Sequence, residues 1–191
     1  MNTRTILAAI LALTLSISFT SAAQDRQGSP QQNRPQQGQV RQGGAQGQRP
    51  DNYIPMEGLE GIDKVYAYLS NFGPYYIATM DGDQPRVRPF SSINFFEGKI
   101  YIQTGHKKDV CKQILANPKV EICAYNGRKW LRIATTLVED HRIEAKKAML
   151  DAQPGLRRMY NENDDNTAVF YMTEATASFN SFTAEPEIVK F

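Results

Sequence analysis

The chain has 191 residues and a formal net charge of +2, with 22 basic and 20 acidic residues. Residues 1–50 hold five of the basic residues and one of the acidic residues, so residues 51–191 carry 17 against 19 and are nearly neutral. This balance argues against a nucleic-acid-binding domain, which usually has a basic face, and it confines any anion site to a local patch. Two isolated cysteines and two histidines match no metal-ligand spacing, so we predict no metal site.

The chain begins with the pattern of an export signal. Arg4 precedes an apolar run from Ile6 to Phe19, and small residues follow. This pattern is typical of a secretory signal peptide, here residues 1–23, that is cut near Ala22 or Ala23. We therefore expect an exported protein, periplasmic or extracellular, without a transmembrane anchor in its mature form.

Residues 24–50 differ in composition from everything that follows. They are rich in Gln, Gly, Pro and Arg and contain no aromatic residue. Such a segment cannot bury enough apolar surface to offset its ordering entropy, so we predict a disordered tether. The folded domain is assigned to residues 51–191.

The pattern of residues 51–191 predicts more strands than helices. Apolar residues at helical spacing predict an amphipathic helix from Leu59 to Asn71. Further helices are expected in the run KKDVCKQILANP, from about His141 to Asp151, and from Pro154 to Tyr160. Six strands are expected, at Tyr75 to Met80, Arg86 to Phe96, Ile100 to Thr104, Val120 to Tyr125, Trp130 to Val138 and Ala168 to Phe182. Most are joined by short turns, which favours a mainly β (α+β) fold built as a small antiparallel barrel.

The segment from Gln84 to Asp109, QPRVRPFSSINFFEGKIYIQTGHKKD, carries the strongest functional signal. Two guanidinium groups on one strand, from Arg86 and Arg88, suit a phosphate group because each presents a planar, charged fork. Strand alternation would place Arg86, Arg88, Phe90, Ser92 and Asn94 on one face and Val87, Ile93 and Phe95 on the other. The alternative is that the paired arginines form an ordinary solvated face.

A second basic group follows at a predicted strand-to-helix turn. Thr104, Lys107 and Lys108 lie where the first backbone N–H groups of a helix have no internal partner and attract anions. Lysines at this end oppose the helix dipole, which indicates a negative group nearby. His106 in the same turn is either a donor to phosphate or an exposed loop residue, and both interpretations stay open.

The residues from Tyr75 to Tyr125, and on through W-L-R at Trp130 to Arg132, resemble the pyridoxamine 5'-phosphate oxidase superfamily. The resemblance is carried by YYIATMDGDQPRVRPF, KIYIQTGHKKDVCKQILANP and VEICAYNGRKWLRI. It implies a six-stranded antiparallel split β-barrel with a few flanking helices, a homodimer, and flavin mononucleotide (FMN) at the subunit interface. The residues it implies for cofactor binding are Arg86, Arg88, Pro89, Phe90, Gln103, Thr104, Lys107, Lys108, Trp130 and Arg132. Of these, Trp130 and Arg132 would reach the cofactor of the partner subunit, and Trp130 could equally be a core aromatic.

The chain departs from the true oxidases of this superfamily at its C-terminal end. Those enzymes grip their substrate with Arg and His, and this chain has neither after Arg158. We therefore expect an FMN-dependent oxidoreductase acting on another small molecule, whose flavin carries the chemistry and for which no catalytic acid or base is assigned. The alternatives are a non-enzymatic flavin or haem binding or storage protein, with His106 and His141 as the only candidate axial ligands, and a scaffold for protein contacts. Export would permit a disulfide between Cys111 and Cys123.

Overall fold

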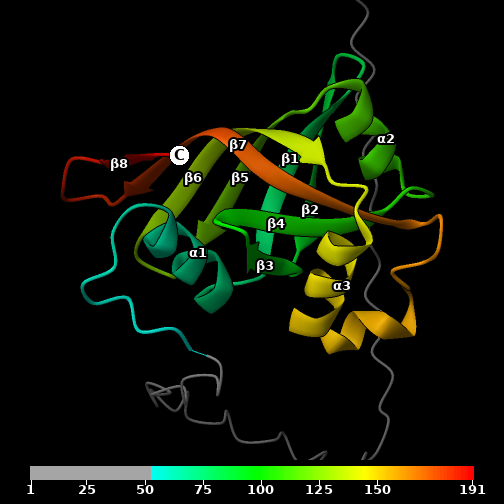
Figure 1. Ribbon diagram of the computed structural model, residues 1–191. Coiled ribbons are helices and arrows are strands. Elements are labelled where there is room, and N and C mark those ends of the chain that lie inside the picture. The colour runs from blue at the N-terminus through cyan, green and yellow to red at the C-terminus, as the bar shows by residue number, and fades with distance from the viewer. Residues whose placement is uncertain (1–52) are drawn as a thin grey trace, which may run out of the picture. The chain divides into compact units, whose positions relative to one another are not determined.

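The computed structural model describes residues 53–191, and Figure 1 shows their arrangement. The predicted signal peptide, residues 1–23, and the predicted tether, residues 24–50, lie outside the described residues. Among the helices of residues 53–191, none combines the length and the apolar character that crossing a bilayer requires.

One antiparallel sheet of eight strands forms the fold. Its order is β2-β1-β5-β6-β7-β4-β3, with β8 paired to β7. The strands are β1 (Tyr75–Asp81), β2 (Gln84–Phe90), β3 (Ile93–Phe96), β4 (Lys99–Gly105), β5 (Lys119–Tyr125), β6 (Trp130–Glu139), β7 (Thr167–Asn180) and β8 (Glu187–Lys190). The predicted mainly β (α+β) split barrel is confirmed, with eight strands in place of six.

The sheet curls into a barrel because its two edge strands are neighbours in the chain. β2 and β3 lie at opposite ends of the sheet order, yet only Ser91 and Ser92 separate them. Phe90 and Ile93 are three residue steps apart, which span about 10 Å at most, so the two edges must meet there (Figure 1). The junction is tied on both sides: the Tyr75 hydroxyl donates to the Ser92 carbonyl at 2.7 Å, and the Ser92 hydroxyl donates to the Gln103 carbonyl at 3.0 Å.

Two of the predicted strands were wrong in extent. The strand predicted from Arg86 to Phe96 is two strands, because the chain turns at Ser91 and Ser92 to cross between the sheet edges. The predicted common face is therefore also wrong: the Val87 side chain is 65% exposed whereas Ile93 is 4% exposed. The strand predicted from Ala168 to Phe182 ends at Asn180, and β8, short and partly charged, was missed.

The α-helices pack against the strands of the sheet. The helices are α1 (Gly61–Asn71), α2 (Asp109–Ala116), α3 (Ile143–Ala152) and the 3₁₀ helix η1 (Pro154–Arg158). All four agree with the predicted segments to within a few residues. α1 buries Val65 and Leu69 against the barrel core, and each such side chain contributes about 1.5–3 kcal/mol by burial. α3 instead covers a smaller cluster with Tyr101 and Met149.

The two cysteines are free thiols, so the disulfide that export would permit is absent from this structure. Cys111 lies on α2 with its side chain fully buried. Burial, with a smaller contribution from the charge of Glu139, raises the pKa of the Cys111 thiol to about 11. Cys123 lies on β5 and is partly buried, and burial raises its pKa as well.

Candidate functional site

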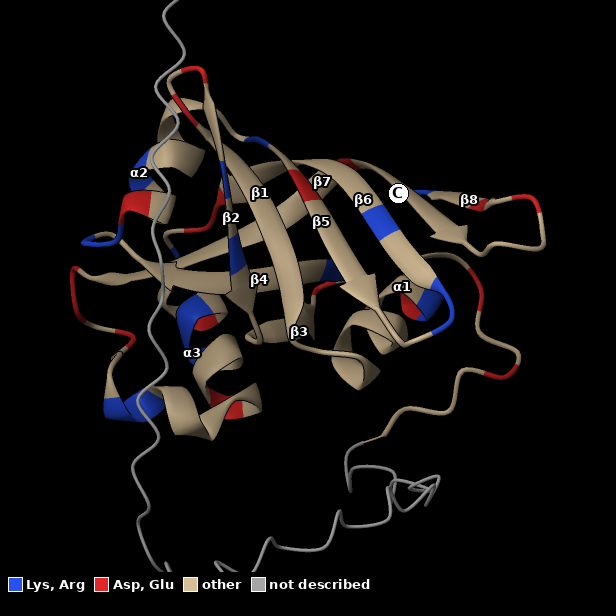
Figure 2. Cartoon of the chain, turned by 180° about the vertical axis from the view of Figure 1, so that it is seen from behind, with Lys and Arg blue, Asp and Glu red and all other residues tan. Residues whose placement is uncertain are grey.

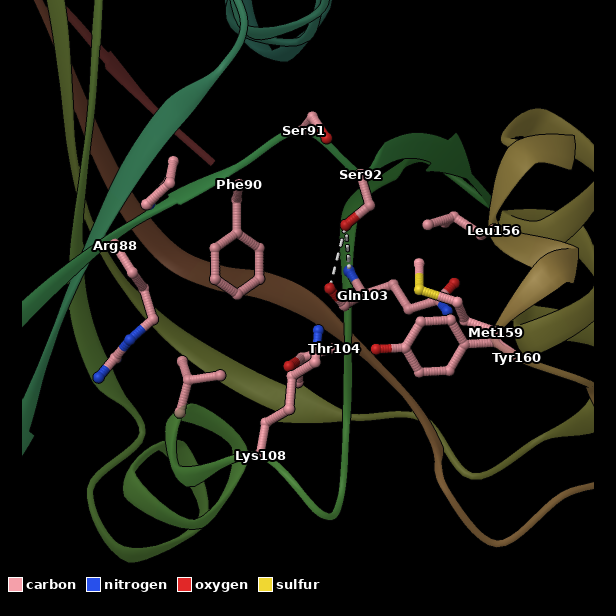
Figure 3. Close-up of a pocket in the computed structure, with 12 residues that line it drawn as sticks. Arg88, Phe90, Ser91, Ser92, Gln103, Thr104, Lys108, Leu156, Met159 and Tyr160 are labelled. Carbon is pink, nitrogen blue, oxygen red and sulfur yellow. Dashed lines mark hydrogen bonds between the residues drawn. The ribbon is translucent and has the colours of Figure 1, made fainter.

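A pocket of about 270 Å³ opens where the end of β2, the end of β4 and the start of α2 meet η1 (Figure 3). Its walls come from segments that are far apart in the chain. Residues that line it are Arg88, Pro89, Phe90, Ser91, Ser92, Gln103, Thr104, Lys108, Val110, Leu156, Met159 and Tyr160. The pocket therefore joins the two basic segments predicted from the sequence and adds a wall that the sequence did not indicate.

Two cations stand at one side of the pocket. Arg88 donates from Nη1 to the Thr79 hydroxyl at 2.7 Å and from Nη2 to Gln113 Oε1 at 3.0 Å. Both acceptors are neutral, so these bonds orient the guanidinium group without neutralising it. Lys108 is the N-cap residue of α2, with extended backbone, and its Nζ lies 5.7 Å from the centre of the Tyr160 ring. No salt bridge among residues 53–191 includes either cation. Asp109 pairs with Lys112, which, with a smaller effect of Arg88, lowers the pKa of that carboxyl.

The centre of the pocket holds polar atoms without partners. Gln103 is 4% exposed and Thr104 is 2% exposed. Neither side-chain atom of the Gln103 amide has a hydrogen-bond partner, nor does Thr104 Oγ1. A buried polar group without a partner costs about 1–3 kcal/mol, so native proteins rarely leave three such atoms at one place. This arrangement indicates a ligand that offers both donors and acceptors.

The third wall of the pocket comes from η1 and the residues after it. Leu156, Met159 and Tyr160 line this side, and Figure 3 shows the Tyr160 hydroxyl directed toward Thr104. Sequence reasoning missed these residues because about fifty positions separate them from Thr104 and their local pattern predicts only a short helix. The one local signal was Pro154, which starts η1.

Gly105, at the end of β4, permits this strand end to approach the segment from Tyr160 to Asn166. A Cβ atom at this position would lie 3.0 Å from Asn166 Oδ1 and 3.0 Å from Tyr160 Cε1. Both distances are tighter than ordinary van der Waals contact, so any side chain at position 105 would displace Tyr160 or Asn166 from the pocket wall. The Lys107 N–H donates to Asn166 Oδ1 at 3.1 Å and fixes the turn in this position.

The structure places six of the ten predicted cofactor residues in the pocket and four outside it. Arg86, two positions from Arg88, pairs with Asp81 at 3.2 Å on the exposed hairpin. The Lys107 side chain is exposed outside the lining. Arg132 pairs with Glu121 on the outer face of the sheet, where its Nη2 lies 2.5 Å from the carboxylate. Arg88 turns toward α2 and Arg86 toward Asp81, so the two guanidinium groups have different partners.

Trp130 lies on neither the pocket wall nor the barrel core. Its ring centre is 5.1 Å from that of Phe182, whose side chain is 84% exposed. Figure 2 shows basic and acidic residues interspersed along the strands in that view, without a continuous basic face. The roles that the resemblance implies for Trp130 and Arg132, toward a partner subunit, stay predictions.

His106 is not an exposed loop residue, nor does it line the pocket. Its two ring nitrogens lie 2.7 Å from the Asp165 carbonyl oxygen and 2.6 Å from Glu139 Oε1. The Tyr101 hydroxyl donates to Asp140 at 3.0 Å, and burial raises the pKa of Tyr101 to about 12. Within residues 53–191 no group of His, Cys, Asp and Glu is arranged to hold a metal ion.

The chain was compared with known proteins. No protein-family model and no curated protein matches it. Among solved structures, a NimC/NimA family protein from Clostridium acetobutylicum is 39% identical, with a TM-score of 0.66, and the match covers 69% of this chain and 92% of that chain. General Stress Protein 26 from Bacillus anthracis is 14% identical, with a TM-score of 0.51, over 61% of this chain and 88% of that chain.

A heme binding protein from Mycobacterium smegmatis is 11% identical, with a TM-score of 0.51, over 64% of this chain and 55% of that chain. At such low identity the last two matches establish the fold alone. The first match covers nearly the whole of its structure at an identity that establishes common descent. The chain therefore belongs to the NimC/NimA family.

Proposed function

We propose that this chain is an exported FMN-binding oxidoreductase that acts on a small molecule. The observation that carries the proposal is the combination, around one pocket, of two cations without salt-bridge partners among residues 53–191 and three buried polar atoms without hydrogen bonds. N-terminal sequencing of the protein recovered outside the cytoplasm tests the export part. An uncleaved chain retained in the cytoplasm contradicts it.

The residues present fit this cofactor. Arg88 and Lys108 would hold the phosphate group, aided by the partial positive charge at the start of α2. The Gln103 amide offers one donor and one acceptor, and the polar edge of a flavin ring needs both. Phe90 and Leu156 supply apolar contact area at the pocket walls. The flavin, when bound, supplies hydride or electron transfer, while the protein orients it and excludes water.

The alternative of a haem-binding protein is less well supported by the geometry. Axial ligation would fall to His106 or His141, because the described chain contains no other histidine. Both lie beside Glu139 and outside the pocket, and both His106 nitrogens already face acceptors.

A storage protein that binds flavin without turnover remains the second hypothesis. Reduction of bound FMN by a nicotinamide donor separates it from the oxidoreductase.

A homodimer is part of the proposal. The outer face of β1, β2 and β5 exposes Tyr76 (47%), Val87 (65%) and Tyr125 (56%), and β2 also carries Arg88. Exposed apolar side chains on adjacent strands favour a protein interface, and the family resemblance implies a second copy there. Sedimentation equilibrium should give twice the monomer mass. A monomer at micromolar concentration would overturn this part.

The pair Arg88→Ala and Arg86→Ala tests the site. Arg88→Ala should weaken FMN binding about tenfold, because a charge-assisted hydrogen bond to the phosphate is lost. Folding should be nearly unaffected, since the Thr79 hydroxyl still donates to Gln113 Oε1 at 2.7 Å. Binding is measured by flavin fluorescence quenching and stability by the melting temperature.

Arg86→Ala is the matched control on the same strand, since Arg86 pairs with Asp81 outside the pocket. It should leave FMN affinity unchanged. If the two variants weaken FMN binding equally, the pocket does not hold the phosphate. If saturating FMN leaves the melting temperature of the wild-type protein unchanged, the FMN proposal itself fails.

A further inference from the structure

Both histidines of the chain converge on one carboxylate. Glu139, the last residue of β6, has a side chain that is 8% exposed. His106 Nε2 lies 2.6 Å from Glu139 Oε1, and His141 Nδ1 lies 3.5 Å from the same oxygen. The His141 side chain is 78% exposed, so the closer and more shielded contact is that of His106.

The geometry around His106 requires an additional proton. Nδ1 lies 2.7 Å from the Asp165 carbonyl oxygen, which can only accept, so Nδ1 must carry a hydrogen. Nε2 faces a carboxylate oxygen at 2.6 Å, so a second hydrogen must lie between them. A neutral ring would leave one of the two acceptors without a donor. The Nδ1–H tautomer would direct a lone pair at the Glu139 oxygen, and the Nε2–H tautomer would direct one at the Asp165 carbonyl oxygen.

His106 lies in the turn that carries the pocket's lysine. Its backbone N–H donates to the Asn166 carbonyl at 2.9 Å, and the Lys107 N–H donates to Asn166 Oδ1. Besides these backbone bonds, the ring contacts Glu139 and the Asp165 carbonyl, and so ties the β4–α2 turn, which positions Lys108, to β6 and to residues 161–166, which follow Tyr160. The β4–α2 turn and the segment from Tyr160 to Asn166 form two walls of the pocket region, and Gly105 allows them to approach each other.

We infer that His106 is a proton-dependent positioning residue, whose protonated ring holds the two walls of the pocket together and makes FMN affinity depend on pH. This inference rests on the proposed function. Loss of the second proton as pH rises leaves Nε2 with no hydrogen to donate and so opens the contact with Glu139. Affinity should be highest on the acid side and fall toward the alkaline side.

Ionisable groups of both signs lie around the ring, and the carboxylate of Glu139, 2.6 Å from Nε2, is in direct contact with it. Glu139 approaches from β6 and repels a neutral ring's lone pair, and His141 shares its oxygen. Asp164 accepts from the backbone N–H groups of Asn166 and Thr167 in the opposite loop, and Lys107 adjoins the ring in the chain. Cys111 on α2 has its pKa raised to about 11, first by burial and then by Glu139, so it stays neutral throughout.

FMN affinity measured by fluorescence quenching from about pH 5.5 to about pH 8.5 tests the inference. The wild-type protein should bind FMN about tenfold more weakly at the alkaline end. The phosphate's own ionisation has the opposite sign, because its second pKa is about 6 and the dianion should bind more tightly to cations. An affinity that rises with pH in the wild-type protein would overturn the inference.

Two variants and a control sharpen the test. Glu139→Gln introduces an amide that can donate to a neutral Nε2, so the alkaline loss of affinity should disappear. His106→Gln removes the titrating ring, so affinity should be weak in acid and rise with pH. His141→Gln, the control, should keep the wild-type profile. If Glu139→Gln retains the alkaline loss, the contact between His106 and Glu139 is not its cause.

A measurement without ligand keeps this inference separate from the proposed function. In NMR spectra of the full chain, the backbone amide signals of Lys107 and Asn166 should shift over the same pH interval as the His106 ring nitrogens. If FMN does not bind but these signals move together, the positioning role stands and the FMN proposal fails. If the ring titrates while the turn signals stay still, the positioning role is wrong.

Discussion

Lys108→Glu is expected to weaken FMN binding about a hundredfold, which corresponds to roughly 2.7 kcal/mol. Lys108 lines the pocket at the start of α2, and no carboxylate in the described part of the chain neutralises it. Glutamate there would place a negative charge beside the phosphate and replace attraction with repulsion. The chain should still fold, because the Lys108 side chain is exposed and makes no hydrogen bond to the core. Isothermal titration with FMN measures the loss.

Lys107→Glu is the matched control, since it makes the same change of charge one residue away. Its side chain lies outside the pocket lining, so only a screened, long-range effect should remain, a few-fold at low salt and less at 0.15 M salt. Equal losses in the two variants would mean that the turn attracts FMN only by its overall charge. The position of Lys108 in the pocket would then carry no significance.

Asp140→Asn is expected to lower the free energy of unfolding by about 2–4 kcal/mol at neutral pH. Asp140 is 7% exposed and accepts hydrogen bonds from the Arg142 side chain, the Arg142 backbone N–H and the Tyr101 hydroxyl. An asparagine amide can accept fewer of these bonds, and it leaves the Arg142 guanidinium group with Glu97 but without its second carboxylate partner. Urea unfolding followed by circular dichroism measures the difference.

The effect of Asp140 should also depend on pH. The hydrogen bond from the Arg142 side chain, above all, lowers the pKa of Asp140 from 3.8 to about 2, against the opposing effect of burial. Because the pKa of Asp140 is lower in the folded chain than in the unfolded chain, its ionised carboxyl stabilises the fold at pH values above the unfolded pKa. This contribution is lost as pH falls from about 4 to about 2. Because the Arg142 side chain is half exposed, the pH-dependent part should be roughly 1–2 kcal/mol.

The wild-type protein and Asp140→Asn should therefore differ less in stability in strong acid than at neutral pH. Asp151→Asn provides a control, because Asp151 also pairs with basic residues, Lys147 and Arg157, but is exposed. That substitution should change stability little at any pH. A stability gap for Asp140→Asn that does not narrow in acid would show that hydrogen-bond geometry, not charge, sets its cost.

Most of the secondary structure could be predicted because it depends on local patterns. The helical spacing of Val65 and Leu69 predicted α1, and both side chains are buried. Alternation predicted β5, in which Val120, Ile122 and Ala124 are buried. Alternation did not predict the faces of Val87 and Ile93. Two residues that cross between sheet edges leave the alternating sequence pattern unchanged, so the pattern does not reveal the crossing.

The pocket residues also fall into those that a local pattern predicts and those that only tertiary contacts determine. Thr104 and Lys108 were predicted together because one strand-to-helix turn of four residues brings them together wherever it lies in a fold. Arg86 and Arg88 have the same strand parity, and only their neighbours distinguish them: Asp81 on the hairpin beside Arg86, and Gln113 on α2 beside Arg88. The roles predicted for Trp130 and Arg132 depend on a partner subunit and stay predictions.

The sequence by itself determined the barrel class, the turn with Thr104 and Lys108, and the near-neutral charge of residues 51–191, because each follows from neighbouring residues or from composition. Only the tertiary structure decided which arginine lines the pocket, that Leu156, Met159 and Tyr160 form its far wall, and that both histidines meet at Glu139. These features join segments up to about seventy residues apart. Their contacts are set by how the strands close and the helices pack, and local periodicity carries no information about that.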